Sequence, residues 1–154
     1  MNALADRFAE MGVGAYFVYT HEAHPGENYP HLTSMTQKFR HARDLRDKLG
    51  VARPILVDAL DGACHRAYGS MPNMTWIFNQ SGIPVYKSDW SDADSIANAL
   101  TYFLAIRERR ANGERLAPFN VHRLDYRNQD REAFLQGLMR SGLKAVKEFK
   151  EAFK

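Results

Sequence analysis

Residues 15–24, Ala-Tyr-Phe-Val-Tyr-Thr-His-Glu-Ala-His, pass from aromatic and β-branched side chains into a polar end. An apolar run of about six residues without polar alternation is typical of a parallel strand that is buried on both faces. We therefore predict such a strand over residues 15–20. Ligands of open α/β sheets bind beyond the carboxyl ends of the strands. Four residues fall at that end and are candidate site residues: Thr20, His21, Glu22 and His24.

The following part of the chain alternates helix and strand patterns. A second buried parallel strand is predicted at residues 54–58, where a β-branched run ends in an acid. The turn-rich residues 79–82 predict an antiparallel hairpin. The expected elements are, in order, a helix at 2–12, the strand at 15–20, a helix from Thr33 or Ser34 to Leu49, the strand at 54–58, a short helix capped by Asp61 and ended by Gly69, strands at 74–78 and 83–87, and a helix capped by Ser91 or Asp92.

The last third of the chain is less regular. Residues 107–129 carry many charges with scattered Leu, Phe and Tyr, as in a long connection whose apolar side chains pack on the domain. From Arg131 the apolar spacing predicts one helix, or two helices broken near Ser141 and Gly142. We expect a domain over 1–106, followed over 107–154 by a charged connection and a helical extension that packs on the same domain.

Charge and composition argue against several classes of protein. The net charge of +3 is dispersed among acids, whereas a nucleic-acid surface concentrates Lys and Arg. No apolar run approaches the roughly 20 residues that cross a bilayer, and residues 1–10 lack the apolar core of a signal peptide. We expect no nucleic acid, no membrane and a cytoplasmic location. The single cysteine, Cys64, excludes an intramolecular disulfide, a CxxC redox pair and a multi-cysteine zinc site.

The order of the expected elements is that of a thioredoxin-like domain entered after its first catalytic strand. Four segments make the likeness more specific, and they resemble the iodothyronine deiodinase-like branch of the thioredoxin-fold proteins, especially its bacterial relatives. These segments are residues 18–25, 40–47, 56–61 and 67–69, so the resemblance covers about residues 1–105. It implies an α/β, thioredoxin-like fold that is incomplete at the N-terminus, where the first catalytic strand is absent, with extra C-terminal helices.

The resemblance also implies an active site. In the family, the Glu and His of a Glu-Ala-His segment and the His before a following charged helix segment belong to that site, and they match Glu22, His24 and His41. The family's nucleophile is a cysteine or selenocysteine on a strand before the first helix, and no residue here matches it. Cys64 does not replace it by position. Pro72 lies near the place where these domains carry a cis-proline facing the active site, so its peptide bond is a candidate for the cis form.

Each candidate also has a purely structural interpretation. Glu22 and His24 share a face of an extended segment, where they would either transfer protons together or only anchor the loop at Pro25. Cys64 is expected to be a buried structural cysteine, as most free cysteines are. Loop histidines with Glu22 or Glu27 are a candidate metal site, but their spacing matches no established motif, and we expect neither metal nor cofactor. These histidines are His21, His24 and His31.

We therefore expect a deiodinase-like thioredoxin-fold protein, related to thiol and selenol oxidoreductases, whose nucleophile is missing from this chain and whose substrate is a small molecule. If the protein is active, oxidoreductase chemistry is the first expectation. One alternative is a non-catalytic binding or dimeric assembly module that keeps a polar pocket near Glu22, His24, His41 and Pro72. Another is acid/base hydrolysis by His and Glu residues without a thiol.

The sheet carries a prediction about assembly. In the thioredoxin-like arrangement the nucleophile strand lies between residues 15–20 and 74–78, so its absence leaves two half-sheets with unpaired inner edges. Backbone groups on buried strand edges need partners. We expect either that the two inner strands close up as an antiparallel pair or, in preference, that a homodimer forms by exchange of segments or by joining of sheets.

Overall fold

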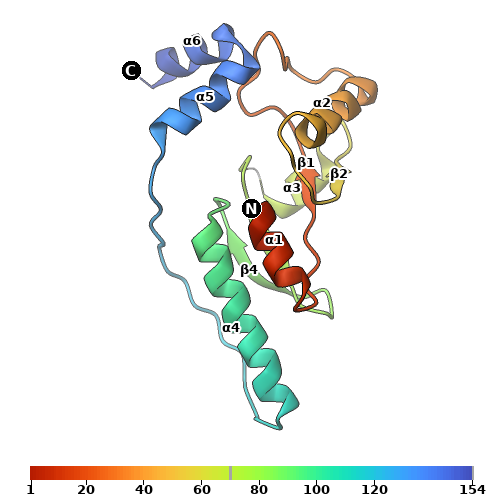
Figure 1. Cartoon of the computed structure of the whole chain (residues 1–154), viewed down its shortest axis with the longest axis vertical. Helices are drawn as coiled ribbons and strands as arrows, with labels where there is room; N and C mark the ends of the chain where they lie inside the picture. Colours follow the sequence, from red (N-terminus) through yellow and green to blue (C-terminus); the bar gives the residue numbers. More distant parts are fainter. Residues whose placement is uncertain (70, 154) are drawn as a thin grey trace. The chain divides into compact units, whose positions relative to one another are not determined.

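The computed structural model describes residues 1–69 and 71–153 and has a mixed α/β structure (Figure 1). The described residues form six helices and two small sheets and divide into two compact units. The hairpin unit consists of Met1, Ala3–Val13 and Asn73–Asn128. The parallel unit consists of Asn2, Gly14–Pro72 and Gln129–Lys154. Both expected segments, 1–106 and 107–154, contribute residues to both units.

The hairpin unit contains two helices and an antiparallel β-hairpin. Its elements are α1 (Asn2–Ala9), β3 (Thr75–Phe78), β4 (Pro84–Ser88) and α4 (Ala93–Ala111). β3 pairs antiparallel with β4, which confirms the predicted hairpin. The side chain of Asn79 holds the turn, because its Oδ1 accepts from the backbone N–H groups of Ser81 and Ile83 at 2.9 and 3.0 Å.

The core of the hairpin unit lies between α1 and α4. Of the two predicted capping residues, Asp92 caps α4 by accepting from the backbone N–H of Ser95 at 2.9 Å. Ile96 and Leu100, one turn apart on the predicted apolar face, are buried together with Phe8 of α1. The apolar stripe of α4 therefore fixes α1 in this unit.

The charged segment predicted over residues 107–129 is not one structural element. Its first residues continue α4, where Arg109 and Arg110 in the last turn suit the negative end of the helix dipole. The chain leaves the helix through Gly113, whose φ of +88° favours glycine. Residues 114–130 have neither helix nor strand.

The parallel unit contains the remaining elements. These are β1 (Phe17–Tyr19), α2 (Met35–Asp47), β2 (Ile55–Val57), α3 (Ala63–Tyr68), α5 (Arg131–Ser141) and α6 (Leu143–Ala152). β1 and β2 pair in parallel, with Val18 opposite Leu56, which confirms the predicted parallel orientation of these strands. Ser34 caps α2 by accepting from the backbone N–H of Gln37 at 3.2 Å. Gly142, with φ of +125°, separates α5 from α6, so the two-helix alternative is confirmed.

The prediction that both faces of the first strand are buried is wrong. Tyr19 is 6% exposed, but Val18 and its register neighbour Leu56 are 39% and 51% exposed. Since side chains alternate along a strand, the sheet buries the face that carries Tyr19 and exposes the face that carries Val18.

The start of α3 also differs from the prediction. We expected Asp61 to cap this helix, but its N-cap position is Gly62, and the Asp61 side chain pairs with Arg66 at 3.0 Å. The carboxylate of Asp58, at the end of β2, accepts from the backbone N–H groups of Cys64 and His65 at 2.9 and 3.0 Å. Asp58 therefore supplies the hydrogen-bond acceptors for N–H groups in the first turn of α3, which have no partner within the helix.

Each sheet has two strands in the described residues. The two alternatives for the inner strands, closing up as an antiparallel pair or forming a homodimer, both stay predictions. The described residues have no cis peptide bond, so the cis form considered for Pro72 is wrong.

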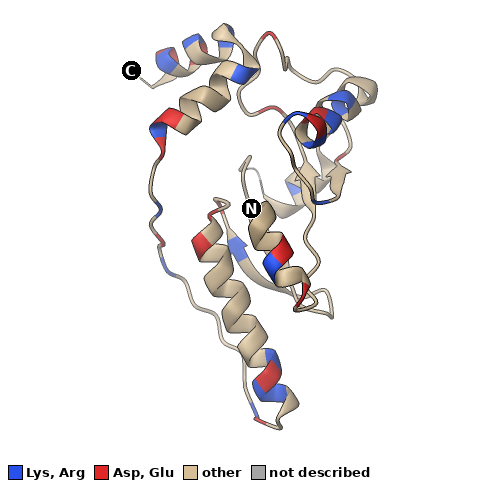
Figure 2. Ribbon diagram, viewed as in Figure 1, with Lys and Arg blue, Asp and Glu red and all other residues tan. Residues whose placement is uncertain are grey.

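Charged side chains of both signs are interspersed along α2 and at the end of α4 (Figure 2). Close pairs accompany this mixing, such as Lys48 with Asp44 at 2.8 Å and Arg109 with Glu114 at 2.6 Å. Within the described part of the chain, no helix combines the length and the apolar character that a membrane span requires.

Candidate functional site

Three polar side chains meet where β1 ends and α2 passes in the parallel unit. Tyr19 is the last residue of β1, Glu22 follows three positions later, and His41 lies in the middle of α2. His41 faces inward with Lys38 and Ala42, which are three residues before it and one after it on the buried side of the helix. We call Tyr19, Glu22 and His41 the triad.

One oxygen of Glu22 joins the triad. Its Oε1 lies 3.0 Å from Nδ1 of His41 and accepts a hydrogen bond from the Tyr19 hydroxyl. The same hydroxyl oxygen is 3.3 Å from Nδ1 of His41. A carboxylate at Nδ1 favours the tautomer with the proton on that nitrogen, because only then does the ring donate to Glu22.

Tyr19 serves the triad as a hydrogen-bond donor. Burial raises the pKa of its hydroxyl, and the hydrogen bond to the negative Glu22 raises it further. The phenol therefore stays protonated at neutral pH and continues to donate to the carboxylate. Its role is to hold Glu22 in place beside the imidazole.

The other ring nitrogen of His41 is the unusual atom of the site. His41 is only 2% exposed, and its Nε2 is buried without a hydrogen-bond partner in the part of the chain that the structure describes. With Nδ1 donating to Glu22, Nε2 is a lone-pair acceptor in the neutral ring and an N–H donor in the imidazolium. Such an arrangement allows His41 to take up or release a proton at Nε2.

Tyr29 covers the imidazole of His41. The two rings meet edge to face, with centroids 5.0 Å apart, and the Tyr29 hydroxyl donates to Oδ2 of Asp44 at 3.0 Å. Burial raises the pKa of Tyr29, and the bond to Asp44 adds to this shift. Sequence reasoning missed this residue, since an aromatic side chain in a Pro- and Gly-rich loop carries no specific signal.

A second polar group, formed by Lys38 and Asp58, lies at the carboxyl end of β2. Lys38 is 1% exposed and its Nζ donates to the carbonyl of Ala59 at 2.9 Å. Burial lowers the pKa of Lys38, although Asp58 opposes the shift. Burial alone would raise the pKa of Asp58, but hydrogen bonds from backbone N–H groups, together with Lys38, lower it. Sequence reasoning missed this group. The spacing of Lys38 three residues before His41, which puts both on one face of α2, could have pointed to Lys38.

The remaining predicted residues have other neighbours. The ring of His21 lies 4.7 Å from that of His65, and burial followed by the charge of His65 lowers the pKa of His21. His24 contacts Phe134 of α5 and Phe149 of α6 edge to face, with ring centroids 5.8 and 5.7 Å away. Thr20 is half-buried beside the triad residue Tyr19 in sequence, and Pro72 is exposed. The structure thus brings Glu22 and His41 together and sets His24 against the C-terminal helices.

Cys64 is half-buried on α3. Burial raises the pKa of its thiol, and the negative charge of Asp58 raises it further. A thiol of this kind is mostly protonated at neutral pH, which disfavours nucleophilic chemistry. In the described residues, no three His, Cys, Asp or Glu side chains are grouped so that they could hold a metal ion.

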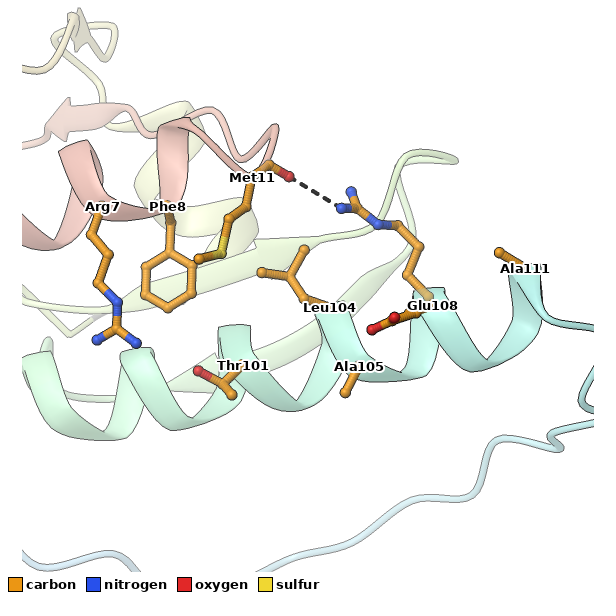
Figure 3. Close-up of a pocket in the computed structure, with 9 residues that line it drawn as sticks. Arg7, Phe8, Met11, Thr101, Leu104, Ala105, Glu108 and Ala111 are labelled. Atoms are coloured by element: carbon orange, nitrogen blue, oxygen red, sulfur yellow. Dashed lines mark hydrogen bonds between the residues drawn. The ribbon is translucent and has the colours of Figure 1, made fainter.

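The hairpin unit has a groove of about 580 Å³ between α1 and α4 (Figure 3). Phe8, Met11 and Leu104 line it with apolar surface, and the guanidinium of Arg107 donates to the carbonyl of Met11 at 3.1 Å. It contains none of the triad residues. Its single carboxylate, Glu108, has no histidine beside it in the lining, so the groove lacks an acid/base pair.

Comparison with known proteins adds no relative to this picture. The chain matches no family model, no curated protein and no solved structure.

Proposed function

We propose that this protein is a deiodinase-like member of the thioredoxin-fold proteins, related to thiol and selenol oxidoreductases, in which the triad transfers the proton of the reaction. The observation that carries this proposal is His41, whose Nδ1 has a carboxylate at 3.0 Å and whose Nε2 is buried without a partner in the described residues. The mixed α/β structure and the parallel pair β1 and β2 are compatible with it. A cytoplasmic location, where thiols stay reduced, belongs to the same proposal.

The proposed reaction is the reductive dehalogenation of a small halogenated aromatic compound by two external thiols. The thiols become a disulfide, the carbon–halogen bond breaks, a carbon–hydrogen bond forms, and the halide leaves with the second proton. His41 delivers the proton to carbon from Nε2, Glu22 stabilises the imidazolium, and Tyr19 holds the carboxylate. The reducing thiols are assigned to a co-substrate because the pKa of Cys64 is raised.

Halide release from an iodinated phenol in excess dithiothreitol tests this proposal. The wild-type protein is expected to accelerate release, and His41→Asn to lower the accelerated rate about 100-fold, the lower range for a positioned general acid. Glu22→Gln, which keeps the side-chain volume, is expected to lower it about tenfold, since a neutral amide stabilises the imidazolium less. His31→Asn, on an exposed loop, is the matched control.

Circular dichroism must show that each variant is folded. Release no faster than with dithiothreitol alone, or full activity of His41→Asn, would overturn the proposal. Thiol-independent hydrolysis of a phenyl ester that is lost in His41→Asn would instead support the alternative of a His/Glu-dependent hydrolase.

A second candidate function is dimeric assembly. The irregular segment 114–130 exposes large side chains, with Phe119, Val121 and Tyr126 at 84%, 71% and 91%. Both sheets have only two strands in the described residues, so strand edges are open to another chain. Exposed apolar side chains and unpaired strand edges each favour association of two copies.

Light scattering at micromolar concentration tests this second candidate. We expect the mass of a dimer for the wild-type chain and of a monomer for the double variant Phe119→Asp and Tyr126→Asp. Tyr102→Asp, at a 59% exposed position on α4, is the control that should stay dimeric. A wild-type monomer would exclude assembly.

A further inference from the structure

Access to His41 requires a movement, because the side chain is 2% exposed and the reactive atom Nε2 is buried. The loop of residues 22–29, here called the site loop, begins at the triad residue Glu22 and ends at Tyr29, whose ring lies on His41. The contacts that hold this loop in place therefore fix both the Glu22 carboxylate and the Tyr29 ring that packs on the imidazole.

Polar contacts attach the middle of the site loop to the junction of α5 and α6. Both carboxylate oxygens of Glu27 accept from the backbone N–H of Lys144 in the first turn of α6, at 3.0 and 3.1 Å. The backbone N–H of Asn28 donates to the Ser141 carbonyl, and its Nδ2 to the Arg140 carbonyl, both at 3.0 Å. The loop thus satisfies one N-terminal donor of α6 and two C-terminal acceptors of α5.

Two glycines make this close approach feasible. A Cβ on Gly26 would collide with the carbonyl of Ser141, and a Cβ on Gly142 would collide with the carboxylate of Glu27. Gly142 also has a φ of +125°, which side chains with a Cβ rarely adopt. The sequence therefore has glycine on both sides of the contact.

An aromatic contact adds to the polar ones. The ring of His24 lies edge-on to Phe134 and Phe149, and these two rings meet with centroids 4.9 Å apart. His24, predicted as a site residue, therefore anchors the loop to α5 and α6.

The attachment is continuous with the cover of His41. The backbone N–H of Gly26 donates to the carbonyl of Tyr29 at 3.0 Å, which closes the loop on itself. Tyr29 then packs on His41 and bonds to Asp44 of α2. Release of residues 26–28 would loosen Tyr29 and uncover the imidazole.

We propose that the helices α5 and α6 together are a clamp on the site loop, and that Glu27 is a positioning residue that controls access to His41. This inference describes how a substrate would reach the triad, and in that respect it rests on the proposed function. The contacts that form the clamp do not depend on it. Opening detaches Glu27 from Lys144 and exposes Nε2, and closing returns Tyr29 to the ring. The clamp is a property of the folded chain and is measurable without turnover.

Diethyl pyrocarbonate labelling, mapped to each histidine by mass spectrometry, tests the clamp. His41 in the wild-type chain is expected to react more than tenfold more slowly than His122, which lies in an exposed segment. Glu27→Ala should raise the rate at His41 about tenfold, because it removes the charged acceptor of the bifurcated hydrogen bond from the Lys144 N–H. Glu27→Gln retains one acceptor oxygen and should give an intermediate rate.

Glu148→Ala is the matched control, since Glu148 lies on α6 and its carboxylate pairs with the side chain of Lys144 at 3.7 Å rather than with the site loop. It should leave the rate at His41 unchanged. His65 reports unfolding of the parallel unit, so its rate should stay constant in all variants. Equal rates at His41 and His122 in the wild-type chain, no increase in Glu27→Ala, or a parallel increase at His65 would each overturn the clamp.

These outcomes are independent of catalysis. Labelling as expected without halide release keeps the clamp and rejects the proposed reaction. Halide release with unchanged labelling in Glu27→Ala rejects the clamp and keeps the reaction.

Discussion

The hairpin unit and the parallel unit both bury apolar side chains, such as Phe8 and Leu138, but differ in the polar side chains that they bury. The core cluster of the hairpin unit is apolar and consists of Phe8, Ile96 and Leu100. The parallel unit buries three polar or charged side chains: Lys38, His41 and Asp58. Removing polar groups from water costs free energy unless partners satisfy them. The polar burial therefore marks the parallel unit as the place to look for function.

The three buried polar residues are not equivalent. Lys38 donates to the Ala59 carbonyl, and Asp58 accepts two backbone N–H groups, so both have structural partners. His41 has a partner at Nδ1 but, among the described residues, none at Nε2. The difference separates two polar groups with structural partners from the one on which the proposed function rests.

The largest expected effect concerns the apolar core of the hairpin unit. Phe8→Ala removes a fully buried aromatic side chain and should lower the free energy of unfolding by about 3–5 kcal/mol. Both tryptophans of the chain, Trp76 and Trp90, lie in this unit, so their fluorescence in urea follows its unfolding. Tyr102→Ala, at a 59% exposed position on α4 of the same unit, is the control and should change little. If Phe8→Ala left the urea unfolding transition unchanged, the apolar cluster would not be what stabilises the hairpin unit.

A smaller effect is expected at Asp58. Asp58→Ala removes the acceptor of two N–H groups at the start of α3 and should lower the free energy of unfolding by about 1–2 kcal/mol at pH 7, as for the loss of a helix cap. The pKa of Asp58 is lowered from 3.8 in the folded chain. Its contribution is therefore present above pH 3.8 and is lost as the pH falls through the folded pKa.

Urea unfolding followed by circular dichroism at pH 7 and at pH 3 measures this dependence. The difference between the wild-type chain and Asp58→Ala should narrow at the lower pH. Asp61→Ala, which removes an exposed ion pair with Arg66, is the control and should have a small effect at both values. A difference that grows at pH 3 would contradict the assigned direction of the pKa.

Local sequence signals predicted much of the secondary structure. The capping residues Ser34 and Asp92, the turn at Asn79 and the break at Gly142 were all readable because each acts through its nearest neighbours along the chain. Burial was less readable. Val18 is exposed because burial depends on what packs over the sheet, and that is set by segments distant in sequence.

The site was predictable only in part. Strand-end placement pointed to Glu22, and the resemblance to a known family pointed to His41, which lie 3.0 Å apart. Tyr29 reaches His41 from an irregular loop. The same loop contacts the C-terminal helices through His24 and Phe149 and through the bond of Asn28 to Arg140, which joins residues 112 positions apart in sequence. Such contacts carry no periodicity or spacing that a single sequence would show.

The smallest expected effect sharpens the comparison inside the parallel unit, between the triad and the lone thiol. Cys64→Ser replaces a half-buried thiol by a hydroxyl and leaves the backbone N–H bond to Asp58 in place, so the free energy of unfolding should change by less than about 1 kcal/mol. Because burial raises the pKa of Cys64, the thiol supplies little thiolate at neutral pH, and halide release should change less than about twofold. We also expect no reduction of insulin disulfides. The Cys64 thiol is mostly protonated, and the chain has no second thiol to resolve a mixed disulfide. Halide release and thermal unfolding, measured on the variant beside the wild-type chain, check both statements. A large loss of rate in a folded Cys64→Ser variant would move the chemistry from His41 to the thiol.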